Sequence, residues 1–449
     1  MKHLFSRLSP AQKIILSFLL VIFCGSLLLS LPLVQTASSQ AGYLDHLFTA
    51  VSMVCVTGLF TRSVVDTYNV WGQLLCMLLI QIGGLGILTF IGFFTMESRK
   101  KLSLKDRRIL RDSFSYGHNR TLGQFVRSIF ITTFTIEGLG ALLLMIRFIP
   151  KFGLRKGIFN SIFLAVSAFC NAGFDNFGND SLLGLQTDVL VNITLALLII
   201  TGGLGFMVWF DLATKFGGKQ KGLHFHTKVV LLLTAGLLVI GTVASLWTEY
   251  NNPGTIGNLS FGDKLLVSFF QTVSMRTAGF ASIDYTAARP VTLFIYLLQM
   301  FLGGAPGGTA GGLKITTFLV LLLFARKEIL GLHHTNIGRR TLAPQLVQKA
   351  FGVTVIFQLT FLLGLLALGL VTDSSHRFIY LIFETVSALA TVGVTANITT
   401  SLNTAGMIVI MLLMFIGRVG PLTLMVSLNH YQPKKAATLH YSKADIMIG

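Results

Sequence analysis

The sequence predicts an all-α transmembrane protein with four pseudo-symmetric repeats, each comprising a spanning helix, a re-entrant pore helix and a second spanning helix. Eight spanning helices and four pore helices would surround one pore. Three observations predict this fold: an apolar composition, eight long apolar segments, and a glycine that recurs four times in phase. Of the 449 residues, 53% are hydrophobic and 12% are charged, whereas a soluble domain has about 25% charged residues.

The apolar segments are long enough to cross about 30 Å of hydrocarbon. They cover residues 14–34, 70–96, 129–146, 189–210, 229–248, 291–325, 350–372 and 402–428, and the sixth and eighth are interrupted. The first is too long for a signal peptide core, so we interpret it as a retained helix. Shorter apolar stretches, such as 46–61 and 265–275, fit re-entrant helices. Such helices are tolerated where they line a cavity or are buried in protein.

The distribution of basic residues predicts the orientation in the membrane. Lys and Arg gather in residues 1–13, 97–120, 213–228, 326–349 and 429–449, while the opposite loops hold few. By the positive-inside rule, we expect both termini of this multi-pass bacterial inner-membrane protein to be cytoplasmic. The net charge of +18 then reflects topology and attraction to anionic lipids rather than a nucleic-acid partner. The four cysteines show no CxxC spacing and predict neither disulfides nor zinc.

An internal repeat organises the chain. A Val-Ser step runs into a glycine in LFTAVSMVCVTGL, IFLAVSAFCNAGF, FFQTVSMRTAGF and IFETVSALATVGV, ending at Gly58, Gly173, Gly279 and Gly393. A second glycine cluster follows each, at 83–86, 202–205, 303–304 and 417–420. The repeats are expected to cover 1–120, 121–222, 223–340, where the second helix is broken, and 341–449 with the C-terminal tail.

The repeated turn predicts an ion-binding filter made of backbone carbonyls. A dehydrated K⁺ needs several oxygen ligands, and glycine permits the turns that aim successive carbonyls inward. The C-terminus of the preceding half-helix also carries partial negative charge. No turn contains a carboxylate, which favours a monovalent ion. The alternative is that these glycines only allow close helix packing, but four in phase argue against it. The candidate residues are Cys55, Val56, Thr57, Gly58, Cys170, Asn171, Ala172, Gly173, Arg276, Thr277, Ala278, Gly279, Ala390, Thr391, Val392 and Gly393.

The sixth segment contains a run that cannot continue as a helix, because glycine and proline disfavour helix by about 1 and 3 kcal/mol per residue. It lacks the spacing of a phosphate-binding loop, so a mobile constriction below the filter is the better interpretation. The candidate gate comprises Gly303, Gly304, Ala305, Pro306, Gly307, Gly308, Thr309, Ala310, Gly311 and Gly312, with Lys314 and Arg418. Lys314 is expected to snorkel or to pair near the loop.

Several charged residues lie at membrane depth. Arg418 replaces a glycine found in the other repeats, and a charge there should face a cavity or a partner. The alternatives are pore lining or an ion pair with an acid such as Glu137, whose own role is open between structure and permeation. Asp45 and Glu384 lie in pore helices, and a favourable interaction with a helix dipole is the preferred role. His224 and His226 do not suggest a metal site.

The turns CVTGL, CNAGF, RTAGF and TVGV and the stretch FIGRVGPLT (415–423) resemble the Trk/Ktr/HKT cation-translocation superfamily, in particular its KtrB-type subunits. The resemblance implies K⁺ as the permeant ion, Na⁺ as an activator, a homodimer and a gating loop in the glycine run. It also implies a cytoplasmic KtrA-like ring of RCK subunits, with ATP or ADP bound only on that partner. The chain has no further N-terminal spans of the TrkH type, which favours the Ktr branch. Arg107, Arg108, Arg339 and Arg340 are expected to contribute to the docking surface, the alternative being a solvated face that contacts only lipid headgroups.

Other classes of function fit less well. An enzyme is disfavoured because the sequence shows no nucleophile with a base, no metal cluster and no phosphate loop. A Na⁺- or H⁺-coupled secondary transporter is the main alternative, since such proteins also contain repeats and broken helices. A purely structural or receptor protein would leave the phased glycines unexplained.

Overall fold

A computed structural model of the chain describes residues 10–86, 122–178, 181–218, 220, 222–372 and 377–420. These residues are mostly helical. The regular strands within them are β1 (Asn336–Ile337) and β2 (Arg340–Thr341), which form an antiparallel hairpin. The docking candidates Arg107 and Arg108 lie outside the described residues, as do residues 1–9 of the basic N-terminal start and the C-terminal tail.

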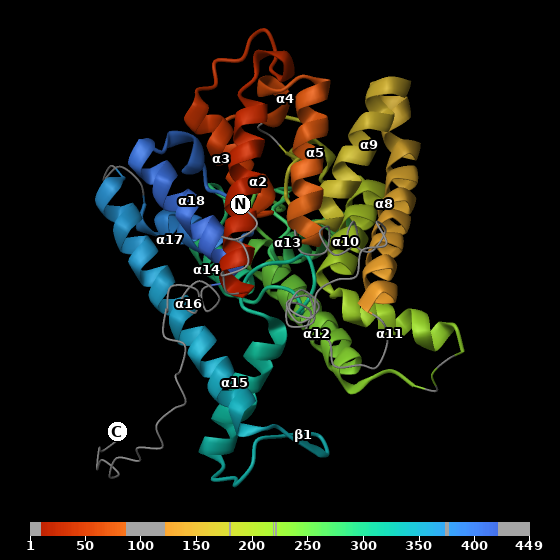
Figure 1. The fold of residues 1–449 in the computed structure, drawn as a ribbon, viewed down its shortest axis with the longest axis vertical. Coiled ribbons are helices and arrows are strands. Elements are labelled where there is room, and N and C mark those ends of the chain that lie inside the picture. Colours follow the sequence, from red (N-terminus) through yellow and green to blue (C-terminus); the bar gives the residue numbers. More distant parts are fainter. Residues whose placement is uncertain are drawn as a thin grey trace, which may run out of the picture.

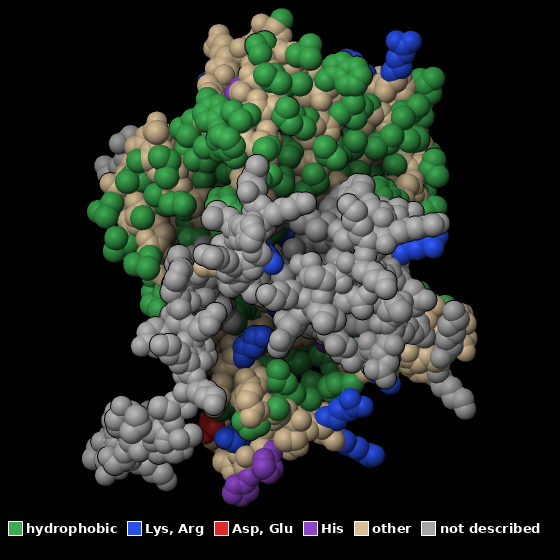
Figure 2. Space-filling view, in the orientation of Figure 1, with side chains coloured by type: hydrophobic (Ala, Val, Ile, Leu, Met, Phe, Trp, Pro, Cys, Tyr) green, Lys and Arg blue, Asp and Glu red, His purple; other side chains and the backbone are tan. Residues whose placement is uncertain are grey.

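Among the described residues, four helices are long and apolar enough to cross a membrane: α2 (Pro10–Leu29), α8 (Leu122–Phe152), α12 (Phe225–Glu249) and α16 (Pro344–Val371). They correspond to the first, third, fifth and seventh predicted spans. Large apolar side chains on their outer faces are exposed, such as Leu20, Leu142 and Leu363. An apolar exterior is what contact with lipid tails requires. Figure 2 shows hydrophobic side chains over the upper part of one face, while Lys and Arg side chains are concentrated lower down.

The other predicted spans begin with shorter apolar helices: α5 (Val70–Leu85), α10 (Val189–Gly203), α14 (Pro290–Phe301) and α18 (Thr404–Val419). One prediction was wrong, because the fourth span is not continuous to residue 210. After α10 the chain bends by 97° into α11 (Phe206–Phe216). At the bend Gly205 has a φ of +90°, and Pro306 of the glycine run packs against it so closely that a Cβ would lie 2.7 Å from the Pro306 carbonyl oxygen.

In the sequence, each long helix is followed by a half-helix and then by one of the shorter apolar helices. The half-helices are α3 (Tyr43–Val54), α9 (Leu154–Phe169), α13 (Phe261–Ser274) and α17 (Phe378–Leu389). Their C-terminal halves are almost wholly buried. Asp45 lies in the first turn of α3, where its carboxylate accepts the Gly42 N–H at 3.0 Å. This position agrees with the expected favourable interaction of Asp45 with the helix dipole. Glu384 instead lies in the middle of α17, away from either helix end.

The sixth span is broken, as the glycine run predicts. α14 ends at Phe301 and α15 (Ile315–Ile329) begins 14 residues later. The intervening loop closes on itself, since the Gly303 N–H donates to the Leu313 carbonyl at 3.0 Å. Below the break, α15, the start of α16 and the β1–β2 hairpin project from one end of the bundle (Figure 1). The short elements are α4 (Val64–Thr67) and the 3₁₀ turns at Pro32–Val34, Leu183–Leu185 and Thr399–Ser401.

Candidate functional site: a ring of four glycine turns

The four half-helices end in turns that meet one another. A Cβ added to the glycine of any turn would press on a carbonyl oxygen in another turn, always that of the residue preceding the glycine. The pairs, with the distance from that Cβ, are Gly58 and Ala172 (2.7 Å), Gly173 and Ala278 (2.7 Å), Gly279 and Val392 (2.5 Å), and Gly393 and Thr57. Following the chain order, the first turn contacts the second, the second contacts the third, the third contacts the fourth, and the fourth contacts the first. The turns therefore form a closed ring that has no space for a side chain at the glycines.

The backbone of each turn alternates in handedness. The glycines have φ values of +101°, +71°, +83° and +97° in chain order. Two residues earlier, a residue other than glycine is also left-handed: Val56 (+55°), Asn171 (+57°), Thr277 (+71°) and Thr391 (+51°). A strand directs successive carbonyls to opposite sides, whereas this alternation can direct them to the same side. Left-handed residues of this kind cost about 1–3 kcal/mol each and persist where their surroundings enforce them.

Sequence reasoning missed the left-handed residues and also missed the serines that hold the turns. Ser52, Ser167, Ser274 and Ser387 are all fully buried. Ser52 and Ser387 accept the N–H groups of the ring glycines Gly58 and Gly393, at 3.2 and 3.1 Å, and Ser167 accepts the Phe174 N–H at 2.9 Å. The third turn is one residue shorter, so the Ser274 hydroxyl instead donates to the Phe280 carbonyl at 2.6 Å. The signal was present in the sequence, because all four serines belong to the repeated Val-Ser step.

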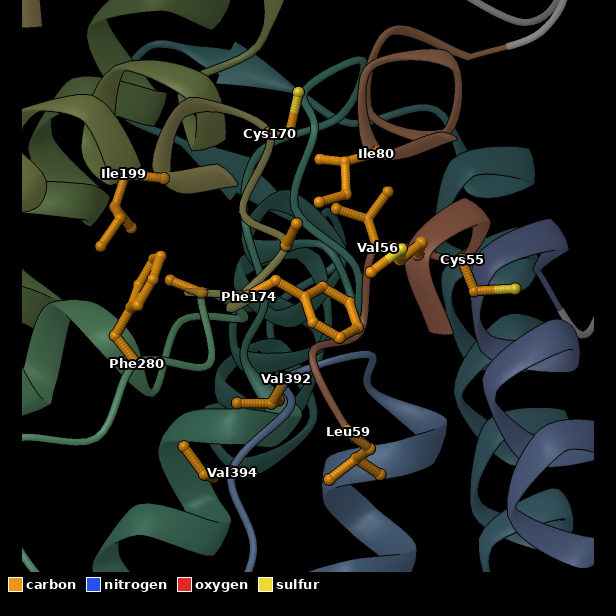
Figure 3. Packing of buried hydrophobic residues seen from close by; sticks show 14 of the residues in the cluster. Cys55, Val56, Leu59, Ile80, Cys170, Phe174, Ile199, Phe280, Val392 and Val394 are labelled. Carbon is orange, nitrogen blue, oxygen red and sulfur yellow. The ribbon is translucent and has the colours of Figure 1, made fainter. Parts of the chain in front are cut away.

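Buried apolar residues surround the turns and limit their movement. The residue after each ring glycine is Leu59, Phe174, Phe280 or Val394, and each is at most 2% exposed. Figure 3 shows these four side chains in one cluster with Cys55, Cys170, Val56 and Val392. Because interiors are packed to crystal-like density, the ring cannot widen without displacing this cluster.

Polar atoms in the turns differ among the units. The hydroxyl oxygens of Thr57 and Thr391 are buried and have no hydrogen-bond partner in the described part of the chain. Arg276 takes the place held by Cys55, Cys170 and Ala390 in the other turns and is 8% exposed. Its Nε atom has no partner among the described residues. The third turn therefore adds a positive charge that the others lack.

The glycine run lies directly against the turns. The Gly311 N–H donates to the Thr277 hydroxyl, and the Thr309 hydroxyl donates to the Phe169 carbonyl, both at 3.0 Å. The Thr309 N–H also donates to the Gly202 carbonyl at 3.1 Å. A Cβ on Gly311 would lie 2.6 Å from the Ala390 carbonyl oxygen. The loop is thus packed between the ring and the end of α10.

Two cationic side chains hold this loop. The Arg418 guanidinium donates to the carbonyl of Thr309 at 2.6 Å, and also to the carbonyls of Gly83 and Gly84 at the end of α5. The Lys314 ammonium donates to the Ala310 carbonyl at 2.7 Å. Arg418 thereby connects α18, the loop and α5.

The alternative of an ion pair between Arg418 and Glu137 is not what the contacts show. The Glu137 carboxylate accepts both its shorter bonds, at 3.0 and 3.3 Å, from the Gln81 amide. Cys170 in the second turn lies beside the same pair, 3.5 Å from the Gln81 amide oxygen. Glu137 therefore contacts Gln81 and Cys170 beside the second turn and does not form an ion pair with Arg418.

His224 and His226 lie at the start of α12. His224 contacts Asp211 of α11 through both its backbone N–H, at 2.9 Å, and its ring. Within the described ranges, no group of three His, Cys, Asp or Glu side chains could hold a metal ion.

A helical membrane protein in which four half-helix turns close into one ring belongs to the class of proteins that move ions or small solutes across membranes. The chain belongs to the TrkH family of cation transport proteins, whose family model matches residues 7–438. This membership agrees with the resemblance seen in the sequence and makes the chain a transport protein, not an enzyme.

Curated relatives cover almost the whole chain. It is 38% identical to the Ktr system potassium uptake protein B of Bacillus subtilis over 446 residues, which are 99% of this chain and 97% of that protein. It is 39% identical to the potassium/sodium uptake protein NtpJ of Enterococcus hirae over 453 residues, covering 100% and 99%. The crystal structure of the potassium transporter TrkH from Vibrio parahaemolyticus shares the fold, with a TM-score of 0.73 at 17% identity, covering 93% of this chain and 84% of that one.

Proposed function

We propose that this chain is the ion-translocating subunit of a K⁺ uptake system and that K⁺ passes through the ring of four turns. The closed ring of glycine–carbonyl contacts carries the proposal. Several backbone carbonyls at one point can replace the hydration shell of K⁺. The hydroxyl oxygens of Thr57 and Thr391, which have no partner among the described residues, are further candidate ligands. The absence of carboxylates from the turns favours a monovalent cation.

The glycine run would be the gate. Residues 303–312 lie against the ring, and Arg418 and Lys314 bind their carbonyls. A loop in that place obstructs the path of an ion, and two positive charges repel a cation. The loop is rich in glycine, so it can change conformation at low steric cost. Opening then requires release of the contacts that Arg418 makes.

The proposed assembly is a homodimer in the bacterial inner membrane with cytoplasmic termini and four repeats per chain. A cytoplasmic RCK-type ring would bind nucleotide and regulate the gate, and Na⁺ would stimulate uptake. The name of the B. subtilis relative, a Ktr system protein, supports a multi-component system. The name of the E. hirae relative, a potassium/sodium uptake protein, supports a link to Na⁺.

K⁺-limited growth tests the function. Expression of this chain in a bacterium without its own K⁺ uptake should restore growth at low K⁺, more strongly when a KtrA-like subunit is present. In liposomes, the purified protein should then carry K⁺ down its gradient at a rate that does not require co-transport. A fixed stoichiometric coupling of K⁺ to Na⁺ or H⁺ would instead establish a secondary transporter, and no K⁺ flux at all would reject both.

Charge reversal at the hairpin tests the docking surface. Arg339 is exposed at the tip between β1 and β2, whereas the guanidinium of Arg340 stacks on the Phe225 ring at 4.6 Å. We expect Arg339→Glu to weaken binding of a KtrA-like ring by about tenfold at low salt and much less at high salt, because exposed charges are screened. The measurement is the affinity of the KtrA-like ring for this chain across a series of salt concentrations. Arg377→Glu at the start of α17 is the control, and equal weakening by both variants would reject a local docking role.

A further inference from the structure

The chain that leaves each ring glycine is tied back to its own half-helix by a side-chain hydrogen bond. In all four units a polar residue of the half-helix bonds a residue two or three positions after the glycine. The pairs are Asp45 with Thr61 (2.6 Å), Asn160 with Asn176 (2.7 Å), Gln271 with Ser282 (2.7 Å) and Glu384 with Thr395 (2.6 Å). We call these pairs the exit latches. Each exit chain is therefore held against its own half-helix.

The latches occupy two different depths. Counted from the buried serine of each unit, Asp45 and Asn160 lie seven residues earlier, whereas Gln271 and Glu384 lie three residues earlier. The difference of four residues is about one helical turn, or about 6 Å along the axis. The half-helices run toward the ring, so the third and fourth units have deep latches and the first two have shallow ones. Gln271 and Glu384 are fully buried, while Asp45 and Asn160 are partly exposed.

The deep latches also hold a second point. Tyr285 donates to the Gln271 side chain at 2.7 Å, and the Thr399 hydroxyl donates to the Glu384 carboxylate. Both partners lie six residues after the ring glycine. Each deep latch therefore fixes the exit chain at two places, and the corresponding side chains of the first two units, Thr49 and Leu164, do not form such a latch.

Glu384 is the latch residue whose burial costs the most free energy. Its carboxylate is fully buried, and it accepts hydrogen bonds from two threonine hydroxyls rather than from a cation. Burial of a carboxylate without a cation is costly, and Gln271 shows that an amide can do the same work in the neighbouring unit. A rigid connection close to the ring is what this carboxylate provides.

We infer that the residues of the deep latches, above all Glu384 with Thr395 and Thr399, are positioning residues. They fix the ring carbonyls nearest the exit chain and so set K⁺ over Na⁺ selection. This inference rests on the filter function proposed above. Selection depends on where the carbonyl dipoles stand. Without the latch, the exit chain of the fourth unit can relax, the cage adapts to the smaller ion, and Na⁺ competes.

Threonine-to-valine variants test this with little change in volume. We expect the double variant Thr395→Val/Thr399→Val to lower the K⁺/Na⁺ permeability ratio in liposomes by at least roughly tenfold, because it removes both hydrogen bonds to the Glu384 carboxylate and one bond to a charged group is already worth about tenfold. Thr61→Val removes the same chemical group from a shallow latch, which lies about one helical turn farther from the ring, and should change the ratio by less than about threefold. Thr354→Val on α16, where the hydroxyl donates to the Ala350 carbonyl one turn earlier in the same helix, controls for the substitution itself.

Substitutions of Glu384 provide a second series of test variants. Glu384→Gln keeps one side-chain oxygen and replaces the other with an amide nitrogen, as in Gln271, and should retain near-native selection, whereas Glu384→Leu should not. A merely structural role would lower thermal stability and total flux in Glu384→Leu while leaving the ion ratio native, and that result would overturn the proposal. Equal effects of Thr61→Val and the deep double variant would overturn it as well. If selection stays native in all four ring-glycine variants, the filter function itself fails, and this inference fails with it.

Discussion

Replacement of Gly393 by serine should abolish most of the preference for K⁺ over Na⁺. A Cβ at this position would overlap the Thr57 carbonyl oxygen and lie 2.8 Å from the Gly58 Cα, and the residue has a φ of +97° that serine resists. The carbonyls of two turns must therefore move. We expect the K⁺/Na⁺ permeability ratio to fall by at least about tenfold, because a backbone shift of this kind costs on the order of 1–3 kcal/mol.

The same substitution elsewhere provides the control. Gly352 lies within α16, and a Cβ added there would have no atom within 4 Å, so Gly352→Ser should retain native selection. Serine at Gly58, Gly173 and Gly279 should each resemble Gly393→Ser, since each meets a carbonyl of another turn. Reversal potentials in mixed K⁺ and Na⁺ measure the ratio. Native ratios in all four folded variants would show that the ring is not the filter.

Replacement of Arg418 by alanine should raise K⁺ flux in the absence of any regulatory subunit. The variant loses the bonds from α18 to the Thr309 carbonyl and to the end of α5, so the glycine loop is less restrained. It also loses a positive charge near the proposed path. At about 5 Å and an effective dielectric constant of about 20, repulsion of a cation is on the order of 3 kcal/mol, or roughly a hundredfold in rate.

Two further variants separate charge from restraint. Arg418→Lys keeps the charge but lacks the planar guanidinium that donates to three carbonyls. It should therefore give an intermediate flux. A chain shortened within residues 305–308 should also conduct more, because less backbone obstructs the path. Lower flux in folded Arg418→Ala protein would support a packing role. Unchanged flux with unchanged dependence on the partner would remove both Arg418 and the loop from gating.

Local features of the site could be predicted from the sequence. The position of each ring glycine was predictable because a short apolar helix, a Val-Ser step and a glycine recur in order, and a left-handed turn is a property of a few adjacent residues. The break after α14 was predictable for a similar reason, since six glycines and Pro306 between residues 303 and 312 cannot form a helix. The bend at Gly205 was not predictable, because it depends on contact with Pro306, 101 residues away.

The sequence by itself determined that the chain is a membrane protein with four phased turns free of carboxylates, because hydropathy and glycine spacing act locally. Only the tertiary structure decided which carbonyl faces each glycine, and that Arg418 binds backbone oxygens instead of Glu137. It also decided that Glu384 bonds Thr395 and Thr399 rather than stabilising a helix end. These outcomes depend on the geometry of a buried polar group, which must be satisfied by whichever partner the packing brings near.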